Sequence, residues 1–146
     1  IRSPGLTSAP AIADYAAELL AADGLDLTEK ECYIDSREKV HFNRLSAAER
    51  KALIEKNPAY GRVICRCETV TEGEILDAIH SPIPPVSVDG IKRRAGAGMG
   101  RCQGGFCGPR VVDLLARELG VSPLTILQDR DGSEILTAYT KGEVRA

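Results

Sequence analysis

Four of the five cysteines in this 146-residue sequence stand in two close pairs. One residue separates Cys65 from Cys67, and four residues separate Cys102 from Cys107. Four thiolates are the usual ligand set of one [2Fe–2S] cluster or one structural zinc ion. The first pair is tighter than zinc pairs, which commonly have two to four residues between the cysteines, so the spacing favours the cluster. Structural zinc, disulfide bonds and inert thiols are the alternatives.

The fifth cysteine and the two histidines are isolated in the sequence. An odd number of cysteines argues against a fully paired disulfide framework, so we interpret Cys32 as a free thiol. His41 and His80 are interpreted as ordinary surface or core residues. A Rieske-type site would need two histidine ligands, which the four paired cysteines make unnecessary.

The residues around both pairs suit an anionic inorganic core. Glycines allow the backbone to pass close to such a core and let its N–H groups point at sulfur, and five of them flank the second pair: Gly98, Gly100, Gly104, Gly105 and Gly108. Between residues 90 and 110 there is no acidic residue but five basic ones: Lys92, Arg93, Arg94, Arg101 and Arg110. This run would offset the charge of a cluster or face an electron partner; the alternatives are a solvated surface and a phosphate contact.

Short helices are predicted to hold these segments in place. Capping boxes at Ser46–Glu49 and Thr71–Glu74 predict one helix that ends at about Lys56, before Asn57-Pro58, and another that runs to Ile79. A short extended stretch at 62–64 leads into the first pair. Further helices are predicted at Val88–Arg94, at Pro109–Gly120 with an apolar stripe, and from Ser122. The predicted fold is therefore mostly α, with little strand.

The first part of the chain is expected to contain one helix and a polar connection. The helix is predicted from Ala9 to Ala22, with Ser8 as its N-cap, Pro10 in its first turn and Gly24 as its end. Residues 25–45 are polar and lack a clear period, and we predict a short strand around Tyr33-Ile34.

From residue 61 to about residue 120 the chain resembles the BFD-like family, the domain named for bacterioferritin-associated ferredoxin. The resemblance rests on Cys65-Arg66-Cys67-Glu68, on 90–94 and on the stretch from Gly98 to Cys107. That family binds [2Fe–2S] through Cys-x-Cys and Cys-x₄-Cys in a small helical fold. The resemblance implies four cluster ligands, Cys65, Cys67, Cys102 and Cys107, and surrounding residues Arg66, Arg101, Gly104, Gly105 and Gly108.

The first 13 residues resemble the last motif of the FAD-dependent oxidoreductase fold of the glycerol-3-phosphate dehydrogenase and amino-acid oxidase type. In that fold a turn and a helix N-terminus lie against the flavin, where the helix dipole stabilises the reduced ring. The resemblance implies that Gly5, Leu6 and Thr7 contact FAD in a full-length parent. No Gly-x-Gly-x-x-Gly follows a strand here, so this chain alone is not expected to bind FAD.

Both motifs, in this order, resemble the C-terminal part of an FAD-dependent glycerol-3-phosphate dehydrogenase-like protein, of the large-subunit type used in anaerobic respiration. We expect residues 1–24 to be the tail of a truncated FAD-binding domain and 25–60 a connecting segment with a short helix. We expect 61–128 to be the BFD-like domain and 129–146 a C-terminal tail. The first residue, Ile1, is not Met, which also favours a fragment.

The expected function is electron transfer from reduced flavin to a downstream acceptor, with catalysis in the parent rather than in this chain. The alternative is a zinc-bound structural, redox-sensing or protein-interaction domain without electron transfer. Exposed clusters are oxygen-labile, so an aerobic preparation is expected to contain zinc or an empty site as well.

The expected partners are the missing N-terminal FAD domain and an electron-acceptor protein or subunit. Nineteen basic and 21 acidic residues and a 4% aromatic content argue against nucleic acid. No apolar run approaches the ~18 residues that span a bilayer, so any membrane contact of the parent would be peripheral. The expected location is the cytoplasm, or the cytoplasmic face of a membrane through a partner.

Overall fold

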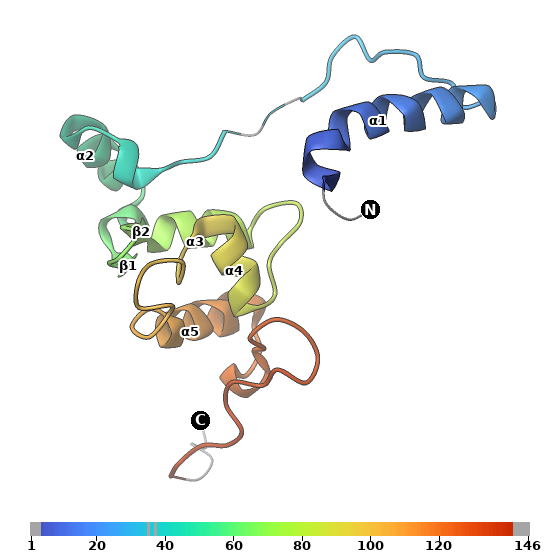
Figure 1. The fold of residues 1–146 in the computed structure, drawn as a ribbon. Helices are drawn as coiled ribbons and strands as arrows, with labels where there is room; N and C mark the ends of the chain where they lie inside the picture. The colour runs from blue at the N-terminus through green and yellow to red at the C-terminus, as the bar shows by residue number, and fades with distance from the viewer. Residues whose placement is uncertain (1–3, 35, 37, 142–146) are drawn as a thin grey trace. The chain divides into compact units, whose positions relative to one another are not determined.

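The structure, a computed structural model, describes residues 4–34, 36 and 38–141. Ile1–Ser3 of the flavin-type motif and the last five residues of the expected C-terminal tail lie outside the described residues. Contacts divide the chain into two compact units, Ile1–Glu38 and Lys39–Ala146. Helix α1 belongs to the first unit, and every other labelled helix and strand belongs to the second (Figure 1).

Helix α1 spans Gly5–Ala22 and begins earlier than the sequence predicts. The N–H of Ser8 already donates to the Pro4 carbonyl at 3.0 Å, so helical bonding starts upstream of the predicted cap. The predicted N-cap at Ser8 is therefore wrong, and Pro10 lies inside the helix rather than in its first turn. The predicted end of the helix is confirmed: it ends at Ala22, and Gly24 has a φ of +91°, a left-handed backbone conformation that favours glycine.

The stretch after α1 contains no strand among its described residues, so the short strand predicted at Tyr33-Ile34 is wrong. A strand needs a backbone partner, and the two strands of the described chain, β1 (Val63–Cys65) and β2 (Val70–Thr71), pair with each other in an antiparallel hairpin. The extended stretch predicted before Cys65 is confirmed as β1, whereas β2 was not predicted.

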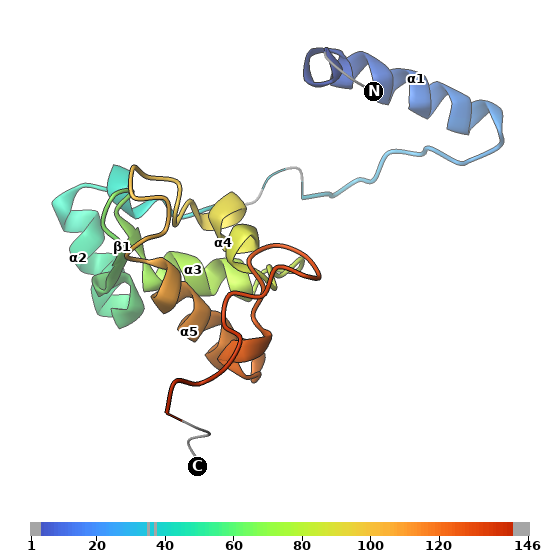
Figure 2. The ribbon, with the colours of Figure 1, turned by 60° about the horizontal axis from the view of Figure 1, so that its bottom comes forward.

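Three helices pack together to form the core of the second unit: α3 (Glu72–Ile79), α4 (Val88–Ala95) and α5 (Gly108–Leu119). Both views of the ribbon show them side by side (Figures 1 and 2). Each contributes at least one fully buried side chain to the common core: Ile75 from α3, Ile91 from α4, and Val111 and Leu115 from α5. The predicted apolar stripe of α5 is confirmed by the burial of Val111, Val112, Leu114 and Leu115. The predicted mostly α fold is confirmed.

Both predicted capping boxes are present. Ser46 and Glu49 cap α2 (Ala47–Lys56), and Thr71 and Glu74 cap α3. Glu74 also accepts the backbone N–H of Phe42 at 3.1 Å. The carboxylate therefore joins the start of α3 to η1 (Phe42–Arg44).

Residues 39–60, expected within the connecting segment, belong to the second unit and pack against the rest of it. Phe42 is buried and stacks on Tyr60 of η2 (Pro58–Gly61), with ring centroids 6.5 Å apart. A Cβ on Gly73 would lie 2.6 Å from the Tyr60 ring, so only glycine lets α3 approach that ring so closely. At the other end, η3 (Pro123–Thr125) confirms the short helix predicted after Ser122.

Candidate metal centre

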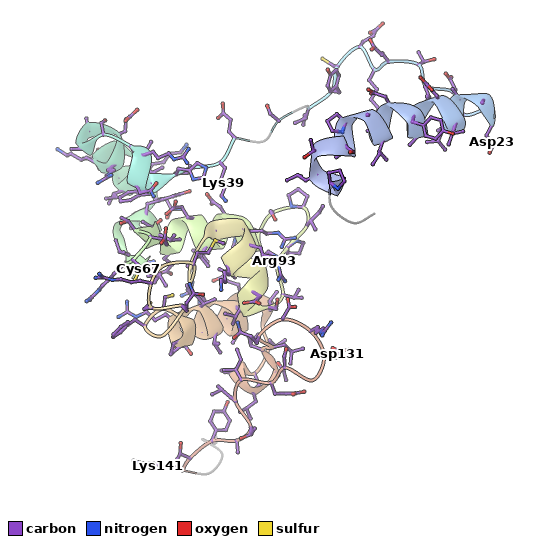
Figure 3. The ribbon with its side chains drawn as sticks, viewed as in Figure 1. Asp23, Lys39, Cys67, Arg93, Asp131 and Lys141 are labelled. Atoms are coloured by element: carbon purple, nitrogen blue, oxygen red, sulfur yellow. The ribbon has the colours of Figure 1, made fainter. Side chains whose placement is uncertain are left out.

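All four paired cysteines line one cavity of about 350 Å³. Cys65 is the last residue of β1 and Cys67 lies in the hairpin turn, whereas Cys102 lies in the loop between α4 and α5 and Cys107 directly precedes α5. Figure 3 shows Cys67 beside that loop. The fold therefore brings together two segments that lie more than 30 residues apart in the sequence.

The cysteines form an inner and an outer pair. Cys65 and Cys107 are buried, with exposures of 1% and 2%, and their thiols interact with each other. Cys67 is exposed and Cys102 is half-buried, and their Sγ atoms are 3.5 Å apart. One end of the site therefore faces the core, and the other end faces solvent.

The two pairs have opposite electrostatic surroundings. Burial, together with the charge and hydrogen bond of nearby Cys65, raises the pKa of Cys107 to about 11. A hydrogen bond with Cys67 lowers the pKa of Cys102. The backbone N–H groups of Phe106, Gly104 and Gly105 also lower that pKa by donating to the sulfur. Donors that stabilise a thiolate also stabilise the negative charge of a metal-bound sulfur.

Gly100 allows the second loop to approach the first. A Cβ at this position would lie 2.2 Å from the Cβ of Cys67 and 2.9 Å from Oε1 of Glu68. The sequence places Gly100 among the flanking glycines but does not distinguish it from them, because the side chain it makes room for, Cys67, lies in a distant segment of the sequence. Gly104 has a φ of +85°, and a Cβ on Gly105 would lie 3.2 Å from the Cys102 carbonyl. At Gly108 a Cβ would meet no heavy atom of the described chain within 4 Å.

A side-chain clamp holds the loop that carries Cys102, and sequence reasoning missed it. The Gln103 amide donates to the carbonyls of Met99 and Gly100 at 3.1 and 3.0 Å, and accepts from Nζ of Lys92 at 3.2 Å. Gln103 has a φ of +48°, which is unfavourable for a residue with a side chain. These bonds fix the loop to α4.

Three exposed arginines line the cavity: Arg66, Arg101 and Arg110. Within the part of the chain that the structure describes, none of them forms an ion pair. The rest of the predicted basic run is used differently. Lys92 belongs to the clamp, and Arg93 pairs with Asp129 and, at 3.9 Å, with Asp89.

The arrangement fits a [2Fe–2S] cluster. Its four thiols are the usual ligand set of such a cluster, and N–H donors and cationic side chains surround them, as an anionic core requires. Among the described residues, no three His, Cys, Asp or Glu side chains gather around a position for a single metal ion.

The remaining candidate residues lie elsewhere. Gly5, Leu6 and Thr7 form the first turn of α1, where N–H groups have no acceptor within the helix, and Leu6 is 92% exposed. Cys32 is an exposed free thiol. His80 pairs with Glu118 at 2.9 Å, which agrees with its interpretation as an ordinary residue. His41 lines a second cavity of about 230 Å³ with Lys39 and other side chains.

Comparison with known proteins agrees with this geometry. Residues 63–117 match the family described as BFD-like [2Fe-2S] binding domain. These residues carry that domain, and they lie within the stretch for which the sequence predicted it. No solved structure gives a significant match to the chain.

Relatives extend the similarity beyond this domain. The chain is 49% identical over 146 residues to a "Glycerol 3-phosphate dehydrogenase" of Caloramator mitchellensis, covering 99% of this chain and 30% of the relative. It is 37% identical over 95 residues to "Hydrogen cyanide synthase subunit HcnB" of Pseudomonas aeruginosa, covering 58% of this chain and 20% of the relative. It is 35% identical over 66 residues to an anaerobic glycerol-3-phosphate dehydrogenase subunit of Escherichia coli K12, covering 45% of this chain and 12% of the relative.

The chain therefore spans less than a third of the length of these relatives. The predicted similarity to a glycerol-3-phosphate dehydrogenase-like protein is confirmed. Within the described residues, no helix is both long enough and apolar enough to cross a membrane.

Proposed function

We propose that this chain is the electron-transfer module of a larger FAD-dependent dehydrogenase. One observation carries the proposal: four cysteines from two distant segments line one cavity, within residues that carry a BFD-like [2Fe-2S] binding domain. The ligands are Cys65, Cys67, Cys102 and Cys107. When bound, a [2Fe–2S] cluster supplies reversible one-electron oxidation and reduction.

The chain's own residues give the site a direction. Cys65 and Cys107 hold the buried end, where the core excludes water. Cys67 and Cys102 hold the exposed end, where an electron donor or acceptor can approach. Electrons therefore enter and leave past the outer pair.

The same surroundings set the reduction potential. N–H groups of Phe106, Gly104 and Gly105 donate toward Cys102, and three arginines line the cavity. Both features favour the more negative, reduced state and therefore raise the potential. A raised reduction potential makes the site suited to accept electrons from a reduced flavin.

The flavin belongs to the part of the parent that precedes this chain. Helix α1 supports this assignment, because its sequence is apolar on more than one side while none of its side chains is buried here. A helix of that kind normally lies inside a domain. We assign Gly5, Leu6 and Thr7 to the flavin contact, through N–H groups at the start of α1.

The relatives support a parent that oxidises a small hydroxy substrate, because two of them are named as glycerol-3-phosphate dehydrogenases. Two are also named as subunits, which supports a partner subunit or another protein as the electron acceptor. We propose as well that the parent works in the cytoplasm or, through a partner, at the cytoplasmic face of a membrane.

Single replacements of the four cysteines test the assignment. Replacing Cys65, Cys67, Cys102 or Cys107 by serine is expected to remove most of the iron, acid-labile sulfide and visible absorption after anaerobic purification. Cys32→Ser is the matched control and should keep all three, because Cys32 does not line the cavity. If any of the four variants keeps full iron and sulfide, that cysteine is not a ligand.

A further inference from the structure

We infer that the exposed end of the cysteine cavity is a docking surface for a separate, acidic electron-carrying protein. This docking surface consists of Arg66, Arg101, Arg110 and Phe106, all exposed and all lining the cavity beside Cys67. The inference rests on the proposed function, because it names the kind of partner that uses the same site.

The charge of the docking surface points to an acidic partner. Its three guanidinium groups have no carboxylate partner in the described chain, in contrast to Arg62, Arg93 and Arg117, which are held in ion pairs. Unpaired, exposed cations attract carboxylates of an approaching protein and accelerate its encounter. Glu68, the acidic residue nearest to Arg66 in the sequence, is half-buried and lines the second cavity with Lys92. Asp113, three residues after Arg110, is exposed but does not line the cysteine cavity.

Phe106 supplies an apolar anchor within the arginines. Its side chain is 82% exposed, although its own N–H points to Cys102 and Cys107 follows it directly. A large aromatic side chain in water, with arginines around it, is the composition typical of the energetic centre of an interface. A partner that covers Phe106 would also come within reach of the outer cysteines.

The composition favours a separate, transient partner over a permanent contact with the parent's own flavin domain. Permanent interfaces are larger and more apolar, whereas electron-transfer complexes are small and are steered by charge. Here one apolar side chain stands among three cations. By contrast, α1 exposes a run of apolar residues and suits a permanent contact: Leu6, Ile12, Tyr15, Leu19 and Leu20.

Calorimetric titration of the anaerobically purified full chain tests the inference at equilibrium. The chain, with its cluster in the oxidised state, is titrated with two oxidised electron carriers of opposite charge, an acidic flavodoxin and the basic cytochrome c, so that no electron moves during the measurement. We expect flavodoxin to bind at least about tenfold more tightly at roughly 0.02 M than at roughly 0.5 M NaCl. Cytochrome c should bind more weakly than flavodoxin at low salt.

Charge reversal locates the binding surface. The variant R66E/R101E/R110E is expected to weaken flavodoxin binding at least about tenfold at low salt. The matched control, R44E/K51E/K56E, changes the net charge equally on exposed residues outside the cavity and should stay within about twofold of wild type. R66K/R101K/R110K keeps the charges and should bind within about threefold of wild type. Phe106→Ser should weaken binding severalfold at both salt concentrations.

A kinetic measurement detects encounters that are too brief for calorimetry. One electron passes from the dithionite-reduced chain to one hexacyanoferrate(III) anion, or to one hexaammineruthenium(III) cation, and each oxidant is reduced by one electron. We expect the rate with the anion to fall, and the rate with the cation to rise, as salt is added. Both slopes should reverse in R66E/R101E/R110E.

Equal flavodoxin binding by the two reversal variants, or tighter binding of cytochrome c by wild type, would overturn the docking surface. In wild type, a rate that rises with salt for the anion or falls with salt for the cation would overturn it too. Iron and sulfide content separates this outcome from failure of the proposed function. If the chain has its full iron and sulfide content and still gives one of these contrary results, only the docking surface is refuted. If the chain contains no iron and sulfide, the proposed function is refuted.

Discussion

At the scale of single residues, the site depends on how differently its four sulfurs are surrounded. The inner thiols lie in the core, and the outer thiols lie among backbone donors and solvent. Burial opposes the charged thiolate, whereas hydrogen bonds favour it. The two pairs should therefore differ in reactivity whenever no metal holds them.

Alkylation of the reduced, metal-free chain measures this difference. At pH 7 iodoacetamide is expected to modify Cys102 well before Cys107, because the lowered pKa of Cys102 gives more thiolate. Cys107, with its pKa raised to about 11, should react faster with each unit of pH up to that value, while Cys102 levels off earlier. Peptide mass spectrometry follows both, and exposed Cys32 reports full accessibility. Equal rates for Cys102 and Cys107 at pH 7 would contradict the assigned surroundings.

Gly100 is the glycine at which an added methyl group is expected to reduce the metal content of the site most. Gly100→Ala would place a Cβ 2.2 Å from the Cβ of Cys67, so the two ligand segments must separate. We expect iron and sulfide per chain to fall by more than about half. Gly61→Ala is the control, because its methyl would make an ordinary 3.4 Å contact with Ile54. Full metal content in Gly100→Ala would show that the close approach is unnecessary.

At the scale of elements, the hairpin and the loop before α5 form the site, and side chains from α3, α4 and α5 hold them in register. Glu72 at the start of α3 binds Arg62 beside β1 at 2.5 Å and Arg117 of α5 at 3.1 Å. Gln103 and Lys92 tie the second loop to α4. Each of these interactions can be removed by a substitution that leaves all four cysteines in place.

Two replacements of Gln103 separate its side chain from its backbone. Gln103→Gly relieves the unfavourable φ of +48° but removes the clamp, whereas Gln103→Ala removes the clamp and keeps the strain. Both are expected to lose iron to a chelator several times faster than wild type, with Gln103→Ala the faster. Should Gln103→Gly match wild type, the side-chain bonds do not hold the loop.

Glu72 gives the fold a pH dependence with a defined sign. Its hydrogen bond with Arg62, helped by Arg117, lowers its pKa below 4.5 despite partial burial. A lowered pKa stabilises the fold fully above about pH 4.5, and this contribution is lost as the pH falls through the folded-state value. Glu72→Gln should therefore cost about 1 kcal/mol in the free energy of unfolding at pH 7, with a difference that shrinks below pH 4.5.

The urea midpoint of the helical circular dichroism signal checks this sign. Glu55→Gln is the matched control, because its pair with Lys51 is exposed and 3.9 Å long, and it should change stability by less than about 0.5 kcal/mol at any pH. A Glu72→Gln difference that persists unchanged at pH 3 would contradict the role given to these ion pairs.

Most features that could be predicted from the sequence are local ones, whereas the shared site of the four cysteines was predicted from ligand chemistry and family resemblance. The capping boxes at Ser46 and Thr71 and the stripe of α5 involve residues within one or two turns, so their spacing reveals them. The close approach of Gly100 to Cys67 and the packing of Phe42 on Tyr60 depend on segments distant in the sequence, which spacing cannot reveal. The start of α1 was mispredicted because Ser8 fits a cap, although the helix had already begun at Gly5.

At the scale of the whole molecule, the two units have different relations to the site. The cavity and its supports lie entirely within Lys39–Ala146, whereas the residues proposed to contact a flavin lie in Ile1–Glu38. Residues 39–146 alone are therefore expected to bind as much iron and sulfide as the full chain, with the same visible spectrum. Loss of the cluster on removing residues 1–38 would show that the first unit supports the site.

The central claim is that the four cysteines hold an iron–sulfur cluster that transfers electrons. The most direct measurement is iron, acid-labile sulfide and zinc per chain in anaerobically purified protein, with the electron paramagnetic resonance spectrum after reduction. We predict about two irons and two sulfides per chain and one unpaired electron in the reduced state. One zinc and no sulfide, even after anaerobic reconstitution with iron and sulfide, would contradict the claim and leave a structural zinc domain instead.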